Sequence, residues 1–312
     1  MTYIFTNVLG TFVFDESLSL IDEKRFSSLE EFEKRESVEK QMKKKHKDSK
    51  VPSKKQLLDI LGFFRSPEFQ KDLRARNIQL TKIAIRDSIN EDNTILAAIN
   101  SINDLDKICN TMSKKLRHWF NLYLPELDHK LDDHETFAYL VHTKTKKELM
   151  KEFDITETMG ADLSKKDVEE MKKFAKRITE MFQMRKDQET YLESIMKKYC
   201  PNIHALAGTM IGAKLFEHAK SLKRLAILPA STIQLLGAEK ALFRHIKTGA
   251  PSPKHGVIIT HPYLTKVKRR DRGQAARLLA GKLSIAARVD FFKGDFIADS
   301  MKKEIEKKLG LE

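Results

Sequence analysis

Two long hydrophobic seams with heptad spacing constrain this chain more than any other feature of its sequence. The first has apolar residues at intervals of 4, 3, 3, 4, 3, 4, 3 and 4, namely Ile95, Ile99, Ile102, Leu105, Cys109, Met112, Leu116, Trp119 and Tyr123. The second crosses polar Arg185 and Glu189 and otherwise has Val168, Met171, Ala175, Ile178, Phe182, Leu192, Ile195 or Met196, and Tyr199. Such spacing lines one side of a helix that pairs with another helix. The seams therefore predict an antiparallel coiled coil with arms of about 35–40 residues, or roughly 50–60 Å at 1.5 Å per residue.

The sequence also marks where these helices begin. Ser66, Pro67 and Glu68 combine a hydroxyl, a proline and an acid in the order that starts a helix, so the first arm is expected to begin there. Ser164 followed three residues later by Asp167 predicts the start of the second arm, and Pro201 predicts its end.

Between the arms, residues 134–153 carry two short apolar patterns, typical of small helices at the tip of the coil. They consist of Phe137, Leu140 and Val141, and of Leu149 and Phe153. An exposed apolar tip would be costly in water, which favours self-association of two chains there. The alternative is that the small helices fold back onto the coil.

The N-terminal residues predict a small α/β unit. Residues 2–8 and 11–14 are β-rich around a turn at Leu9 and Gly10, which indicates a hairpin. Residues 29–50 are so highly charged that they predict a solvated helix. A short helix containing Leu57, Leu58, Leu61, Phe63 and Phe64 is expected to pack on the hairpin.

Composition limits the class of partner. The 312 residues carry a formal net charge of +14, with 33% charged and 41% hydrophobic residues, which favours nucleic acid or an anionic membrane surface as partner. No stretch approaches the roughly 20 apolar residues that span a bilayer, and no signal peptide is visible at the start. Cys109 and Cys200 fit neither a metal spacing nor a disulfide framework, so we expect reduced cysteines and a cytoplasmic protein.

The positive charge is concentrated in one stretch. Between residues 240 and 288 the only acidic residue is Asp271, while the basic residues are Lys240, Arg244, Lys247, Lys254, Lys266, Lys268, Arg269, Arg270, Arg272, Arg277, Lys282 and Arg288. A polyanion would suit this stretch because each neutralised phosphate releases counterions. A solvated basic face is the alternative.

Two groups within this stretch are suited to RNA. Lys254 and His255 stand in a loop bounded by proline and glycine, which can offer an imidazole to an unpaired base and an ammonium to a phosphate. Arg244 and Lys247 fall on one helical face near Lys240. From residue 203 onward the helices are rich in small residues, which lets helices pack closely: Ala205, Ala207, Gly208, Gly212 and Ala213. Gly208 and Gly212 lie in a helical context and are interpreted as packing residues. Helices should break at Pro229, at 249–256 and at Pro262, and resume after Thr265 and near 271–287.

Four blocks in this part resemble the Nop domain, in the order and approximate spacing of that family: Leu228–Thr232, Gly237–Phe243, Pro253–Gly256 and Ala286–Asp290. The whole chain is similar to archaeal scaffold proteins of box C/D guide ribonucleoproteins. The resemblance implies a mainly α fold in three parts: a small α/β domain that docks the methyltransferase (residues 1–65), a coiled-coil dimerisation domain with tip helices (66–200), and a compact, all-α Nop domain that binds the ribonucleoprotein (201–312).

The resemblance also implies partners and roles. The partners would be a box C/D guide RNA, a small kink-turn-binding protein similar to ribosomal proteins, a fibrillarin-type methyltransferase and a second copy of the chain. Gly237, Ala238 and Glu239 would lie at the composite surface of protein and RNA. The RNA-binding residues would be Lys240, Arg244, Lys247, Lys254 and His255, and the basic run Lys268, Arg269, Arg270 and Arg272 is expected to touch the RNA backbone.

The sequence offers no catalytic constellation and no glycine-rich loop between a strand and a helix, so no cofactor is expected. His129, His134 and His142 lie among acidic residues but match no metal-ligand pattern. A non-catalytic scaffold for RNA-guided ribose 2′-O-methylation of rRNA or tRNA is therefore the expected function. A scaffold of another kink-turn particle, of the spliceosomal type, and an RNA-modifying enzyme are the alternatives.

Overall fold

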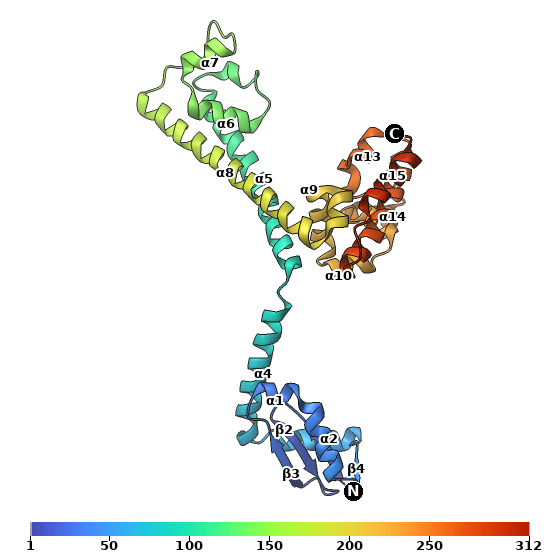
Figure 1. Ribbon diagram of the computed structural model, residues 1–312. Coiled ribbons are helices and arrows are strands. Elements are labelled where there is room, and N and C mark those ends of the chain that lie inside the picture. The colour runs from blue at the N-terminus through green and yellow to red at the C-terminus, as the bar shows by residue number, and fades with distance from the viewer. Residues whose placement is uncertain (1, 312) are drawn as a thin grey trace. The chain divides into compact units, whose positions relative to one another are not determined.

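The computed structural model describes residues 2–311 and divides into two compact units, Met1–Ile89 and Asn90–Glu312 (Figure 1). The boundary expected after residue 65 falls between two helices, and the helix that follows it groups with the N-terminal unit. Among the described residues, no helix is both long enough and apolar enough to cross a membrane.

The N-terminal unit is built on a four-stranded sheet in the order β3-β2-β1-β4. Strands β1 (Thr2–Thr6) and β2 (Gly10–Phe14) form the predicted antiparallel hairpin, with Tyr3 opposite Phe14. The sequence analysis missed β3 (Leu20–Arg25), which pairs with β2, and β4 (Ser49–Lys50), which runs parallel to β1.

Helices cover this sheet, and here two expectations were wrong. The charged stretch forms two helices, α1 (Leu29–Glu33) and α2 (Arg35–Lys45). Helix α2 is not fully solvated, because its Val38 and Met42 are buried against Val13 and Phe26. Its apolar side chains lie four residues apart and so share one face of the helix.

Helix α3 (Lys54–Phe63) packs on the other apolar cluster of the sheet, as predicted, with Phe63 and Phe64 in contact as expected but with Ile60 in place of Leu58 and Leu61. Ile60 and Phe64 are buried, whereas Leu58 and Leu61 are 69% and 42% exposed. Phe69 of α4 (Pro67–Ser88) joins the same cluster, so the start of α4 belongs to this unit's core. Ser66 precedes α4 but makes no side-chain capping bond.

The first arm of the coil is a separate helix, α5 (Glu91–Phe120), which begins after a break at Ile89 and Asn90. The Asn90 side chain accepts a hydrogen bond from the Asp92 N–H (3.0 Å) and caps the helix. The Asp92 carboxylate in turn accepts from the Leu222 N–H (3.0 Å). The base of the coil is thereby tied to the helical domain that follows it.

Helix α8 (Lys165–Tyr199) lies along α5 and confirms the predicted antiparallel coiled coil (Figure 1). The seam residues are largely buried, among them Ile95, Ile99, Ile102, Leu116, Met171, Ile178 and Leu192. Where the second seam turns polar, Arg185 pairs with Asp106 of α5 and with Glu189 of its own helix. An ion pair across the coil therefore fills the interruption in its apolar contacts.

The tip is formed by η1 (Pro125–Leu127), α6 (His134–Thr143) and α7 (Lys146–Glu152). Phe137, Val141 and Leu149 are at most 1% exposed because they pack on α5 and α8 of the same chain. The exposed apolar tip from which we inferred self-association is therefore absent from the described residues. The small helices fold back onto the coil instead.

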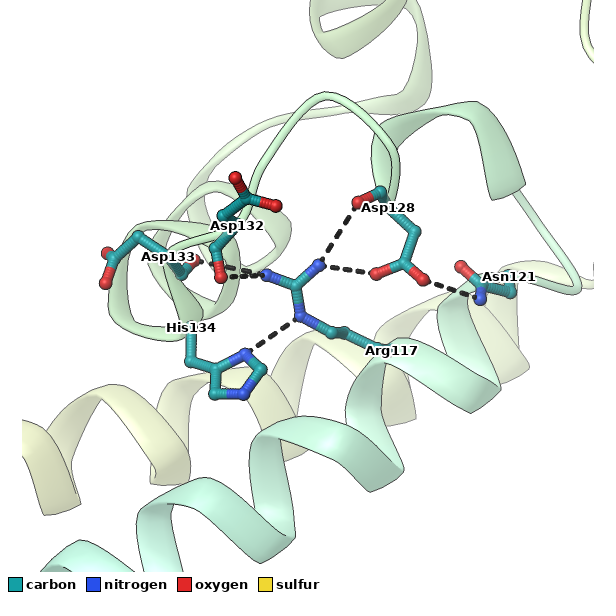
Figure 2. Close-up of polar contacts among 6 residues, drawn as sticks. All are labelled: Arg117, Asn121, Asp128, Asp132, Asp133 and His134. Carbon is teal, nitrogen blue, oxygen red and sulfur yellow. Dashed lines mark hydrogen bonds and ion pairs between the residues drawn. The ribbon is translucent and has the colours of Figure 1, made fainter.

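One arginine holds this tip together (Figure 2). Arg117 of α5 pairs with the Asp128 carboxylate, donates from Nη2 to the carbonyl oxygen of Asp132 (3.1 Å) and from Nε to His134 Nδ1 (3.0 Å). Its guanidinium also lies 4.3 Å from the centroid of the Phe137 ring. A single buried cation thus fixes the connection between the arm and α6, and it uses His134, which had been weighed as a metal ligand.

The remaining helices form one all-α domain whose core is continuous with the base of the coil. They are α9 (Pro201–Ala219), α10 (Leu222–Ile227), α11 (Ala230–Leu235), α12 (Glu239–Thr248), η2 (Val257–Thr260), α13 (Pro262–Lys266), α14 (Arg272–Phe291) and α15 (Ala298–Leu309). The breaks match the predicted ones, except that α13 begins at Pro262 and ends where we expected a helix to resume. Gly208 was interpreted as a helix-packing residue, but it has φ +74° and kinks α9.

Buried Asp290 locks this domain to the end of the coil. Its carboxylate accepts hydrogen bonds from the Asn202 N–H (3.1 Å), the Asn202 side chain (2.8 Å) and the Ile203 N–H (2.9 Å). These bonds satisfy the free N–H groups at the start of α9, which has no capping side chain of its own. Asp290, the last residue of the block 286–290, therefore caps the start of α9.

Candidate nucleic-acid interface

The block Gly237–Glu239 forms a tight corner between α11 and α12. Gly237 has φ +85°, and a Cβ there would lie 2.5 Å from Val257 Cγ1. Its N–H donates to Glu239 Oε1 (2.8 Å), and the same oxygen lies 3.4 Å from His218 Nδ1. Partial burial opposes ionisation of Glu239, but the hydrogen bond from Gly237 outweighs it and the pKa of Glu239 is lowered. The Glu239 carboxylate therefore binds the backbone of the corner and stabilises its conformation.

The loop at residues 249–256 is fixed at both ends. At its start, Gly249 ends α12 in the left-handed conformation (φ +68°), and His245 of α12 hydrogen-bonds the Ala250 carbonyl oxygen. At its end, the Gln234 side chain donates to the Lys254 carbonyl oxygen (2.6 Å), and the Gly256 N–H donates to the Gln234 carbonyl oxygen (2.8 Å). A Cβ on Gly256 would lie 1.8 Å from the Leu236 carbonyl oxygen, so only glycine fits.

This fixed loop presents both residues that the sequence singled out. Lys254 is exposed and His255 is half-buried. The aliphatic part of Lys254 lies over Gly273, whose ideal Cβ position is 3.5 Å from Lys254 Cδ. The loop therefore joins the end of α12 to the start of α14, and a ligand held by its side chains would meet both helices.

Helix α12 stands on the surface with no buried residue among its ten. Lys240, Arg244 and Lys247 are exposed and recur at intervals of four and three, so they share one face as predicted. On the adjoining face Phe243 and Ile246 are 63% and 69% exposed. The sequence analysis included Phe243 in a family block but gave neither residue a role of its own, although their spacing of three on an otherwise basic helix was the signal.

The basic run Lys268, Arg269, Arg270 and Arg272 leads into α14. The first three are exposed, and Arg270 Nε lies 3.4 Å from the carboxylate of the neighbouring Asp271. Other cations of the stretch have structural partners, since Lys282 pairs with Glu304 and Arg288 Nε donates to the Ala226 carbonyl oxygen (3.1 Å). The structure thus separates the exposed cations around α12, the loop and the start of α14 from cations that are engaged within the domain.

The chemistry of this surface is that of binding. Within residues 2–311, no three His, Cys, Asp or Glu side chains lie together in a way that could hold a metal ion. Exposed ammonium and guanidinium groups can neutralise phosphates, and a loop imidazole can stack on a base. Adjacent exposed Phe243 and Ile246 would favour a protein partner at the same place.

The architecture defines a class: an antiparallel coil continuous with an all-α domain that carries a rigid basic surface. Residues 101–310 match the family model Nop, described as snoRNA binding domain, fibrillarin. The chain belongs to the Nop family.

Named relatives agree with this assignment. The chain is 41% identical over 268 residues to a NOP5 family protein of Methanocaldococcus jannaschii, covering 80% of this chain and 64% of that protein. It is 33% identical over 241 residues to Nucleolar protein 56 of Homo sapiens, covering 70% and 41%. It thus spans less than two thirds of the length of either relative. A solved fibrillarin/Nop5p complex aligns over 98% of both chains at 24% identity with a TM-score of 0.47.

Proposed function

We propose that this protein is a non-catalytic scaffold of a box C/D guide ribonucleoprotein. It would bind a kink-turn RNA together with its small protein and recruit fibrillarin for RNA-guided ribose 2′-O-methylation of rRNA or tRNA. The observation that carries the proposal is α12, which exposes a basic face and an apolar face side by side beside a fixed Lys-His loop. The description of the family as snoRNA-binding supports the same conclusion.

The two faces of α12 would divide the work of recognition. Lys240, Arg244 and Lys247 would contact phosphates, while Phe243 and Ile246 would pack against the kink-turn protein. Lys254 and His255 would reach an unpaired base and its backbone, and the run at 268–272 would extend the phosphate contacts. Gly237, Ala238 and Glu239 would hold α12 at the required angle from α11, since the Glu239 carboxylate is already bound to Gly237. Phosphate contacts position the RNA, whereas base contacts and the protein partner specify it.

The N-terminal unit would dock the methyltransferase. Its helix α3 exposes Leu58 and Leu61 on one face, and Val51 just before it is 88% exposed. These side chains are available to a partner because α3 packs on the sheet through other residues, namely Ile60, Phe63 and Phe64. We assign docking to residues 1–65, dimerisation to 66–200 and ribonucleoprotein binding to 201–312.

Reconstituted methylation tests this proposal. Guide RNA, kink-turn protein, fibrillarin and S-adenosylmethionine should transfer methyl groups to a target RNA only when this chain is added. A variant lacking residues 1–89 should still assemble on the RNA but support no methylation. The deletion ends at the boundary between the units because a cut at residue 65 would leave Phe69 without its core. Full methylation with the shortened chain would place docking elsewhere, and methyl transfer by the chain without fibrillarin would make it an enzyme.

A further inference from the structure

A groove between α14 and α15 lies outside the surface described above. It is lined by Arg277, Leu278, Gly281, Lys282 and Ile285 of α14 and by Lys308 of α15. The two helices contact each other beside it within the same domain (Figure 1). None of these residues belongs to α12, to the loop at 249–256 or to the basic run.

The floor of the groove is apolar. Leu278, Gly281 and Ile285 follow one another at intervals of three and four and therefore share one face of α14. Leu278 is partly buried against the core, while Ile285 is 42% exposed. An isoleucine on an exposed face of a helix that already packs on the core elsewhere is free to contact a partner.

Within residues 2–311, nothing requires a glycine at position 281. It lies in the interior of α14 with a negative φ, where glycine costs about 0.5–1 kcal/mol relative to alanine. A Cβ at this position would meet no atom within 4 Å. Neither backbone conformation nor internal packing requires glycine here, whereas the close approach of another backbone would.

The rim of the groove is positively charged. In the part of the chain that the structure describes, neither Arg277 nor Lys308 takes part in an ion pair, while Lys282 pairs with Glu304. Arg277 and Lys308 stand on different helices and so flank the apolar floor. A partner that fits must carry carboxylates beside apolar side chains.

We propose that this groove docks an acidic amphipathic helix of a partner protein. Such a helix would place apolar side chains on Leu278 and Ile285, bring its backbone close at Gly281, and direct carboxylates at Arg277 and Lys308. An RNA strand would use the cations but would gain little from an aliphatic floor, and it would not require a glycine. The proposal is independent of the proposed function because it uses none of the residues assigned to the kink-turn complex.

A fluorescence-anisotropy titration of the full chain with a labelled model peptide tests the proposal. The peptide is a helix of about 20 residues with Leu at i, i+4 and i+7 and Glu at the flanking positions. The wild type should bind it saturably in the micromolar range, and Gly281→Leu should weaken binding by about tenfold or more, because the new side chain fills the groove. Gly281→Leu keeps every charge, and its thermal unfolding temperature should be equal or higher because leucine favours the helix.

Matched controls separate the groove from the surface around α12. Ile246→Glu on α12 should leave peptide binding unchanged, and Gly281→Leu should leave the gel shift on kink-turn RNA unchanged. Absence of saturable binding to the wild type, or equal binding to Gly281→Leu, would overturn the proposal. A loss of binding to single-stranded RNA in Gly281→Leu with unchanged peptide binding would also overturn it, and would assign the groove to RNA.

Discussion

His255 occupies a loop whose backbone is bound at both ends, so its imidazole is presented without a large loss of loop entropy on binding. If the ring stacks on an unpaired base, His255→Ala should weaken binding of the kink-turn RNA–protein complex by roughly 1–3 kcal/mol. Equilibrium gel shifts on the assembled complex measure this loss. Unchanged affinity would show that the ring does not contact the RNA.

Lys247 should behave differently, because a phosphate contact carries no sequence information. Lys247→Ala is expected to weaken binding about equally for different RNAs and to reduce the salt dependence of log K by about one unit of slope. Titrations at several salt concentrations give the slope. The control is Lys55→Ala, an exposed lysine of the N-terminal unit, which should leave the slope as in the wild type.

At this scale, sequence reasoning identified cations but could not tell which were free. Arg244 and Arg288 look alike in the sequence, yet the exposed Arg244 side chain forms no hydrogen bond or ion pair with residues 2–311, while Arg288 donates to Ala226, a residue far away along the chain. The same limit hid the role of Arg117, whose partners come from a connection that only the fold brings back to it. The block around Gly237 was recognised by its resemblance to the family. The structure shows why a glycine stands there, since a Cβ would collide with Val257.

At the scale of single elements, the tip of the coil leads to a prediction about how stability depends on pH. Burial, and then the charge of Arg117, lower the pKa of His134, which accepts a hydrogen bond from Arg117 through Nδ1. The folded protein therefore favours the neutral ring, whereas the unfolded chain takes up a proton near the ordinary value of 6.5. The stabilisation is complete above that value and is lost as the pH falls below it.

Chemical unfolding from pH 7.5 to 5.5 (about one unit either side of the ordinary histidine value) should show this loss in the wild type. His134→Gln keeps an acceptor for Arg117 but cannot titrate, so its stability should fall less over the same range. His118→Gln, at an exposed position of α5, should follow the wild type. Identical slopes for His134→Gln and the wild type would exclude His134 as the source.

Helices with a regular apolar spacing could be predicted from the sequence. Short elements, and elements defined by tertiary contacts, could not. The coil follows from the heptad seams, because their residues are buried by a partner helix at regular intervals. Strand β4 has two residues and is defined only by pairing with β1, and β3 (LIDEKR) is too charged to be distinguished from a loop. The tip helices were found, but their partner was not, since the sequence shows an apolar face and not what covers it.

At the scale of the whole molecule, self-association remains a prediction, but it no longer rests on uncovered tip helices. Phe137, Leu140, Val141 and Leu149 of the tip are covered within one chain. The apolar side chains that remain exposed on the coil and its tip include Leu122 (59%), Tyr139 (53%), Met159 (89%) and Met184 (51%). Light scattering at tens of micromolar (a range suited to weak and strong dimers) should give twice the 36.1 kDa of one chain. The full chain is required because Ile95 and Ile99 share a core with α9 and α14, and a fragment ending at Tyr199 would expose them. A monomer mass would remove the dimer.

The central claim is that the surface formed by α12 and its loop recognises a kink-turn RNA and the small protein bound to it as one object. A gel shift on kink-turn RNA with and without that protein tests it most directly. The chain alone should bind weakly, with strong dependence on salt, because only phosphates are neutralised. With the small protein present, binding should be tighter, and Ile246→Glu should abolish the gain while leaving the weak binding in place. Equal affinity with and without the protein would contradict the claim, since the chain would then recognise RNA by itself.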